Sequence, residues 1–64
     1  MSDEYYYIKI RSIEYDRPDW FVTKGGFSPS PNGIRVFDDI DEAIDVKKIV
    51  QDGHQGYRVE IRRF

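Results

Sequence analysis

The fold of this chain is decided by residues 39–53, whose sequence is DIDEAIDVKKIVQDG. This stretch predicts an α-helix that begins after Asp39, because a carboxylate at the N-cap accepts hydrogen bonds from the first turn and Glu42 follows at the capping-box position. Gly53 is the expected residue just past the end of the helix. One side of the helix is apolar and carries Ile40, Ala43, Ile44, Val46 and Val50. That side has to be buried against a second layer of structure.

Segments on either side of this helix alternate between apolar and polar residues, which is the pattern of half-buried strands. Residues 5–13 place Tyr6, Ile8 and Ile10 on one face, and residues 57–64 place Tyr57, Val59 and Ile61 on one face. Residues 20–24 follow a predicted turn over residues 14–19 and predict a further strand that closes a hairpin with the first.

The segment between the hairpin and the helix is less regular. Gly25 and Gly26 end the second strand, and residues 27–33 have the composition of a loop. Residues 34–37 form either a short edge strand or the approach to the helix. We therefore expect residues 1–64 to be a single α+β domain of order β-β-(β)-α-β, in which a small antiparallel sheet of three to four strands has one helix on one face.

Composition narrows the class of function. The chain has 64 residues, no cysteine and one histidine, so thiol chemistry and thiolate metal sites are excluded. His54 is expected to be an exposed loop residue or a favourable cation near the helix end, and not a catalytic base. No catalytic or metal-binding motif is present. We therefore expect a protein that is not an enzyme and that uses no cofactor. No apolar run is long enough for a membrane span, and residues 1–4 are acidic, which favours the cytoplasm.

The sheet face without a helix is the first candidate surface. It is expected to carry aromatic and cationic side chains: Tyr5, Tyr7, Lys9, Arg11, Arg58, Arg62 and Phe64. An ordinary solvated face, a protein-binding face and a platform for single-stranded nucleic acid all remain open for this pattern. Of the neighbours Trp20 and Phe21, one must point to the core and the other away, and whichever is exposed is a candidate interface anchor; Trp20 is included on that basis.

A second candidate surface is acidic and belongs to the helix. It consists of Asp38, Asp41, Asp45 and Asp52. These carboxylates either complement the positive end of the helix dipole or imitate a row of phosphates toward a basic groove. The net charge of −2 therefore hides an acidic helix opposed to a basic, aromatic sheet face.

Residues 37–64 also resemble a known class of protein. The sequence DEAI at residues 41–44, followed by GYRVE at residues 56–60, is similar to small bacteriophage host-takeover proteins, in particular the T7-like phage inhibitors of host RNA polymerase. The resemblance implies binding to the polymerase jaw through an arginine-rich final strand and acids near the hairpin. Arg63 falls near one of the arginine positions of that strand.

Together these observations predict a small phage or mobile-element protein that inhibits a host macromolecule by occupying a charged groove. The target is RNA polymerase or a nucleic-acid-handling defence enzyme such as a CRISPR effector, in the cytoplasm of a bacterial host. The alternative is a single-stranded nucleic-acid-binding module that uses the open sheet face. The chain is expected to be a monomer or a weak homodimer.

Overall fold

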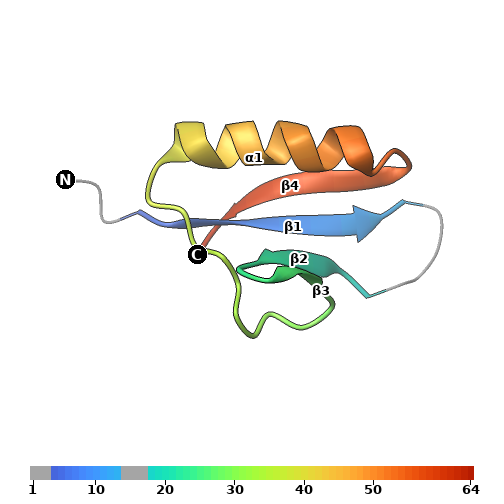
Figure 1. The fold of residues 1–64 in the computed structure, drawn as a ribbon, viewed down its shortest axis with the longest axis horizontal. Helices are drawn as coiled ribbons and strands as arrows, with labels where there is room; N and C mark the ends of the chain where they lie inside the picture. The colour runs from blue at the N-terminus through green and yellow to red at the C-terminus, as the bar shows by residue number, and fades with distance from the viewer. Residues whose placement is uncertain (1–3, 14–17) are drawn as a thin grey trace.

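The computed structural model describes residues 4–13 and 18–64 of the chain, and most of the turn predicted at residues 14–19 lies outside the described residues. Its elements are β1 (Tyr6–Ser12), β2 (Trp20–Thr23), β3 (Gly26–Ser28), α1 (Ile40–Gly53) and β4 (Tyr57–Arg63). The strands form one antiparallel sheet in the order β3-β2-β1-β4, with α1 along β4 and β1 (Figure 1). The α+β class and the single helix are confirmed.

The core lies between α1 and one face of the sheet. β1 and β4 pair along their whole length, which sets Ile8 beside Ile61 and Ile10 beside Val59 on the face toward the helix. The Ile8 side chain is completely inaccessible to solvent. Within the described part of the chain, seven residues from the sheet, the helix and the segment before the helix are buried: Ile8, Ile10, Val22, Phe37, Ala43, Val50 and Val59. The inward faces predicted for both long strands are thus confirmed.

The helix start is confirmed and its end is corrected. The Asp39 carboxylate accepts a hydrogen bond from the Asp41 N–H at 2.9 Å, while Glu42 does not close a capping box and instead accepts from Arg35 at 3.0 Å. Gly53 is the last residue of the helix and not the glycine beyond it, because His54 is the C-cap. The left-handed backbone that favours glycine occurs later, at Gly56, where φ is 92° and the chain turns into β4.

The third strand is not where the sequence predicted it. Lys24 and Gly25 form a tight turn, so the chain folds back at once as β3 and Phe27 pairs with Val22. The glycines therefore make a hairpin turn and do not begin a long loop. Residues 34–37 form no regular strand and make only isolated bridges at their two ends.

Those isolated bridges have a structural reason. β1 pairs with β2 at only two positions, so the two strands separate toward one end of the sheet. The segment 34–37 enters that gap: Phe37 exchanges both backbone hydrogen bonds with Tyr6 at 2.8 Å, and Ile34 bridges to Thr23. Phe37 is thereby buried, with the Arg35 guanidinium 4.6 Å from the centre of its ring. No helix within the described residues has the length and apolar character that a membrane crossing requires.

The N-cap provides a test of the fold. We expect Asp39→Ala to lower the free energy of unfolding by about 1 kcal/mol, because the Asp41 N–H loses its acceptor. Urea unfolding followed by circular dichroism measures the change. Asp38→Ala is the matched control, since it removes the same charge from the neighbouring exposed position, and it should change stability by less than about 0.5 kcal/mol. Equal effects of the two substitutions would contradict the cap.

Candidate functional site

The strand register determines which side chains share the face away from α1. It sets Tyr7 opposite Arg62, Lys9 opposite Glu60 and Arg11 opposite Arg58 between β1 and β4, and Lys9 opposite Phe21 between β1 and β2. Since side chains alternate along a strand, these residues all point away from the helix. We call this surface the arginine–aromatic face; its members are Tyr5, Tyr7, Lys9, Arg11, Phe21, Arg58, Glu60, Arg62 and Phe64.

Three aromatic rings run across the strands of this face. The ring of Tyr7 lies 6.2 Å from that of Phe21 on β2 and 6.3 Å from that of Phe64 at the end of β4. The Tyr7–Phe64 contact is edge to face, at 86°, so the rings pack on one another and do not lie flat as a series of parallel platforms. Phe64 remains 73% exposed, which makes it the most accessible apolar side chain of the face.

Four cations surround the rings, together with two carboxylates. Lys9 forms a 3.1 Å ion pair with Asp19, and Arg11 lies 3.9 Å from the same carboxylate. Arg62 lies 4.0 Å from Glu60, at the limit of an ion pair. Arg58 makes no ion pair with any described residue and stands directly opposite Arg11.

The opposed pair Arg11 and Arg58 is electrostatically unfavourable. Like charges directly across two strands repel each other, and here both side chains are exposed. An anion placed between or above the two guanidinium groups would remove the repulsion and accept hydrogen bonds from both. The arrangement therefore suits an anionic partner group.

Two residues singled out in the sequence lie elsewhere. Trp20 pairs with Ile10 and thus points to the helix side, while Phe21 points to the open face. Trp20 is nevertheless 42% exposed, because α1 packs on β1 and β4 and does not extend over β2. Arg63 is opposite Tyr6 on the helix side of β4.

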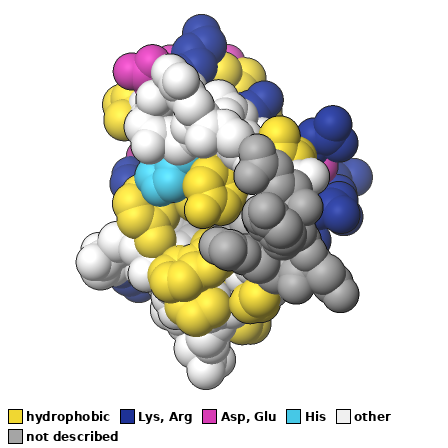
Figure 2. Space-filling model, turned by 90° about the vertical axis from the view of Figure 1, so that its right-hand side faces the viewer, with side chains coloured by type: hydrophobic (Ala, Val, Ile, Leu, Met, Phe, Trp, Pro, Cys, Tyr) yellow, Lys and Arg dark blue, Asp and Glu magenta, His cyan; other side chains and the backbone are white. Residues whose placement is uncertain are grey.

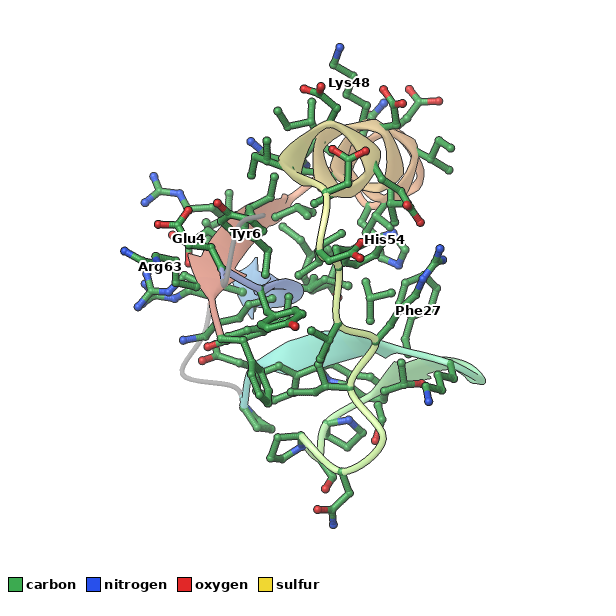
Figure 3. All side chains as sticks on the ribbon, turned by 90° about the vertical axis from the view of Figure 1, so that its left-hand side faces the viewer. Glu4, Tyr6, Phe27, Lys48, His54 and Arg63 are labelled. Atoms are coloured by element: carbon green, nitrogen blue, oxygen red, sulfur yellow. The ribbon has the colours of Figure 1, made fainter. Side chains whose placement is uncertain are left out.

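Arg63 belongs to a small polar cluster at the end of β4. Its guanidinium lies 3.0 Å from one oxygen of Glu4, whose other oxygen accepts a 2.8 Å hydrogen bond from the Tyr6 hydroxyl. That hydrogen bond raises the pKa of Tyr6 above its ordinary value, because ionising the hydroxyl would remove the donor. Figure 3 shows the three side chains together, on the side of the molecule away from His54 and Phe27.

A pocket of about 340 Å³ lies on the helix side, at the opposite end of the sheet. Its lining is mostly apolar: Ile10, Ser12, Pro18, Trp20, Phe27, His54 and Tyr57. His54 is half-buried and not an exposed loop residue as predicted, since its ring packs edge-on against Phe27 at 5.0 Å and Tyr57 at 6.0 Å. Figure 2 shows the imidazole among hydrophobic side chains on this end of the molecule.

The acidic surface is on the opposite layer from the arginine–aromatic face. Asp38, Asp41, Asp45 and Asp52 are all exposed, and none makes an ion pair with a described residue. Lys47 and Lys48 lie on the same helix, so the helix surface carries charges of both signs, with more carboxylates than ammonium groups. The structure thus separates the two charged surfaces that were expected from the sequence.

Three contributors to these surfaces are absent from the candidate residues chosen from the sequence. Phe21 is the alternative to Trp20 that the sequence leaves open, and strand alternation already predicts Glu60 on the face of Arg58 and Arg62. The hairpin partner Phe27 could not be assigned to the pocket, because its strand was interpreted as a loop.

The side chains on these surfaces carry guanidinium groups, carboxylates, aromatic rings and one imidazole. Among residues 4–13 and 18–64, no group of three or more His, Asp or Glu side chains could hold a metal ion. No protein-family model, no curated protein and no solved structure matches this chain. Its function has to follow from the chemistry of these surfaces.

The tautomer of His54 is a direct test of the pocket. The Nδ1 atom lies 2.8 Å from the Val50 carbonyl oxygen, which can only accept, so Nδ1 must carry the proton and Nε2 keeps its lone pair when the ring is neutral. We expect ¹⁵N NMR at a pH where the ring is neutral to find the Nδ1–H form dominant in the folded chain. The urea-unfolded chain is the reference. A dominant Nε2–H form in the folded chain would contradict the contact.

Proposed function

We propose that this chain is a small binding protein that acts without catalysis, and that its arginine–aromatic face occupies an acidic groove of a partner protein. The observation that carries the proposal is the exposed pair of Arg11 and Arg58, which face each other across β1 and β4. Phe64, 73% exposed, lies on the same face. Arginine and aromatic side chains are the residues that most often dominate the binding energy of protein interfaces.

A protein partner fits this face better than a nucleic acid because of its carboxylates. Asp19 and Glu60 lie among the cations and would repel a continuous phosphate backbone. The rings of Tyr7, Phe21 and Phe64 contact one another at tilted or perpendicular angles. A groove with its own mixed charges can complement such a face.

The proposal also names the kind of partner that is bound. The similarity of residues 37–64 to phage host-takeover proteins supports a phage or mobile-element protein that inhibits a host macromolecule in the bacterial cytoplasm. RNA polymerase and nucleic-acid-handling defence enzymes such as CRISPR effectors are the targets we propose. Inhibition would follow from steric occupation of the groove, with the acidic helix surface turned away from the partner.

The test is capture of a host protein by the immobilised chain from a bacterial lysate, followed by direct binding to purified RNA polymerase. We expect Arg58→Glu combined with Arg62→Glu to weaken binding at least about tenfold, because two favourable charges become repulsive. Lys24→Glu combined with Lys48→Glu reverses two exposed cations outside the arginine–aromatic face, so it is the control for total charge and should bind normally. Retention of no host protein, or equal retention by both variants, would count against the proposal.

One observation favours a second function. The rings of Phe21, Tyr7 and Phe64 cross three adjacent positions of the sheet beside four cations, which is a feature of single-stranded nucleic-acid platforms. If protein binding is the function, we expect labelled single-stranded oligonucleotides to show no saturable binding even at low salt. Saturable binding that weakens linearly with the logarithm of salt concentration, and that Arg62→Glu abolishes, would select the nucleic-acid function instead.

A further inference from the structure

The two edges of the sheet are protected to different extents. β3 forms one edge, is only three residues long, and runs directly into a segment with Pro29 and Pro31, which cannot donate a backbone hydrogen bond. β4 forms the other edge, is seven residues long, and contains no proline. A long unprotected edge is a template for pairing with another strand.

The direction of the backbone groups of β4 follows from its hydrogen bonds. The Phe64 N–H donates to the Tyr5 carbonyl at 2.8 Å, on the β1 side. In an antiparallel pair successive residues alternate in direction, so Tyr57, Val59, Ile61 and Arg63 point their N–H and C=O groups away from β1. Gln51 of α1 confirms the alternation, because its side chain bonds to the carbonyl of Tyr57 at 2.9 Å and to the N–H of Val59 at 3.2 Å.

The first part of this outer edge is already occupied. The Gln51 amide acts there as a neighbouring peptide would, and the Tyr57 N–H donates to the His54 carbonyl at 3.2 Å. The outward groups that remain are the Val59 carbonyl and the N–H and C=O groups of Ile61 and Arg63. These five groups have no hydrogen-bond partner within the described part of the chain.

We propose that a second copy of this chain pairs with β4 in antiparallel orientation around a two-fold axis at Ile61. Each Ile61 N–H then donates to the other copy's Ile61 carbonyl, and each Arg63 N–H donates to the other copy's Val59 carbonyl. These four hydrogen bonds use only groups that have no partner among residues 4–13 and 18–64. Two four-stranded sheets thereby join into one sheet of eight strands.

The side chains of β4 select this register. With the axis at Ile61, Glu60 of each copy lies opposite Arg62 of the other, so two cross-strand ion pairs form on the open face. An axis at Arg62 also allows four hydrogen bonds, but it places the two Arg62 side chains directly opposite each other. An axis at Glu60 allows only two bonds and opposes two carboxylates.

Registers toward the start of β4 are blocked. An axis at Val59 would need the Tyr57 and Val59 groups that Gln51 and His54 already hold. In the Ile61 register the Val59 N–H keeps its bond to Gln51, so only the Val59 carbonyl is shared with Arg63 of the second copy. This register is therefore the one in which four hydrogen bonds between free groups and complementary charges occur together.

The helix side of the new pair is also compatible. Ile61 and Ile44 are half-buried in the single chain, and Ile44 lines an open groove along α1 together with Gln51, the residue that reaches the β4 edge. The second copy's Ile61 arrives on this same side and adds apolar burial. Arg63, which would lie opposite Val59, is already paired with Glu4 of its own chain.

The inference does not rest on the proposed function, because its hydrogen bonds lie along the strand edge, although Glu60 and Arg62 of the arginine–aromatic face help to select the register. The Arg63→Pro test below changes only the edge and therefore separates the two proposals. Its consequence for binding is that two arginine–aromatic faces lie side by side on one continuous sheet. A partner with a repeated acidic surface would meet both at once, and the second contact would gain from high effective concentration.

The first experiment tests the backbone hydrogen bonds of the proposed dimer separately from the side chains. Sedimentation equilibrium of the purified chain over a range of concentrations should show a mass that rises from 7.6 kDa toward twice that value. Arg63→Pro removes an outward N–H from a strand edge, where proline is tolerated, and should weaken dimerisation at least about tenfold by deleting two of the four hydrogen bonds. Arg63→Ala loses the same side chain but keeps the N–H, and should dimerise nearly as the original chain does.

A second experiment tests the register with charge. Arg62→Glu opposes two carboxylates in each half of the pair and should leave a monomer, whereas Arg62→Lys should dimerise. Glu60→Lys should likewise be monomeric alone, and mixing it with Arg62→Glu should restore a mixed dimer. Far-UV circular dichroism establishes that each variant is folded.

Three results would overturn the inference. They are a constant monomer mass at all concentrations, dimerisation of Arg63→Pro equal to that of Arg63→Ala, and a homodimer of Arg62→Glu as strong as that of the original chain. The charge variants keep the inference testable if the proline variant does not fold.

Discussion

The pairing of β1 with β4 is the interaction on which the rest of the structure depends. It joins the first and last strands of the chain over seven residues, whereas β1 and β2 pair at only two positions. The long pairing aligns Ile8 with Ile61 and Ile10 with Val59 beneath α1, so the core is built mainly on these two strands. Because side chains alternate, the same register brings Arg11 and Arg58 together on the other face. The register of β1 and β4 therefore determines both the core on one face of the sheet and the candidate site on the other face.

The elements that could be predicted are those specified by local pattern. The alternation of residues 6–10 and 57–61 and the capped, amphipathic residues 39–53 identify two strands and a helix without knowledge of any partner. The hairpin of β2 and β3 could not be predicted with the same rules, because Gly25 and Gly26 indicate a turn equally well before a loop or before a strand. The insertion of residues 34–37 between β1 and β2 depends on the separation of these two strands. That separation is a property of the tertiary structure, and no local sequence pattern predicts it.

The candidate site was predictable to the same extent. Strand alternation alone places Tyr7, Lys9, Arg58 and Arg62 on the face opposite the core, since each lies between two inward residues. The pairing of Lys9 and Arg11 with Asp19 depends on how β2 returns to β1, and the choice between Trp20 and Phe21 depends on the register of only two residue pairs. The pocket around His54 combines the end of α1, the start of β4 and the hairpin, so its formation requires the whole fold.

The one helix of the described residues leaves much of the sheet uncovered. A domain of this size has too little material to cover every face of its sheet, and α1 packs only on β4 and β1. The open face, the exposed Trp20 beside the pocket and the unpaired part of the β4 edge are three consequences of that shortage. The sequence protects the β3 edge with prolines and the beginning of β4 with Gln51, yet leaves Val59 to Arg63 open, where the charges of Glu60 and Arg62 are self-complementary. An edge that had only to be protected would be served by like charges along its length, which would repel every second copy, so the opposite charges at alternate positions favour selective pairing over protection.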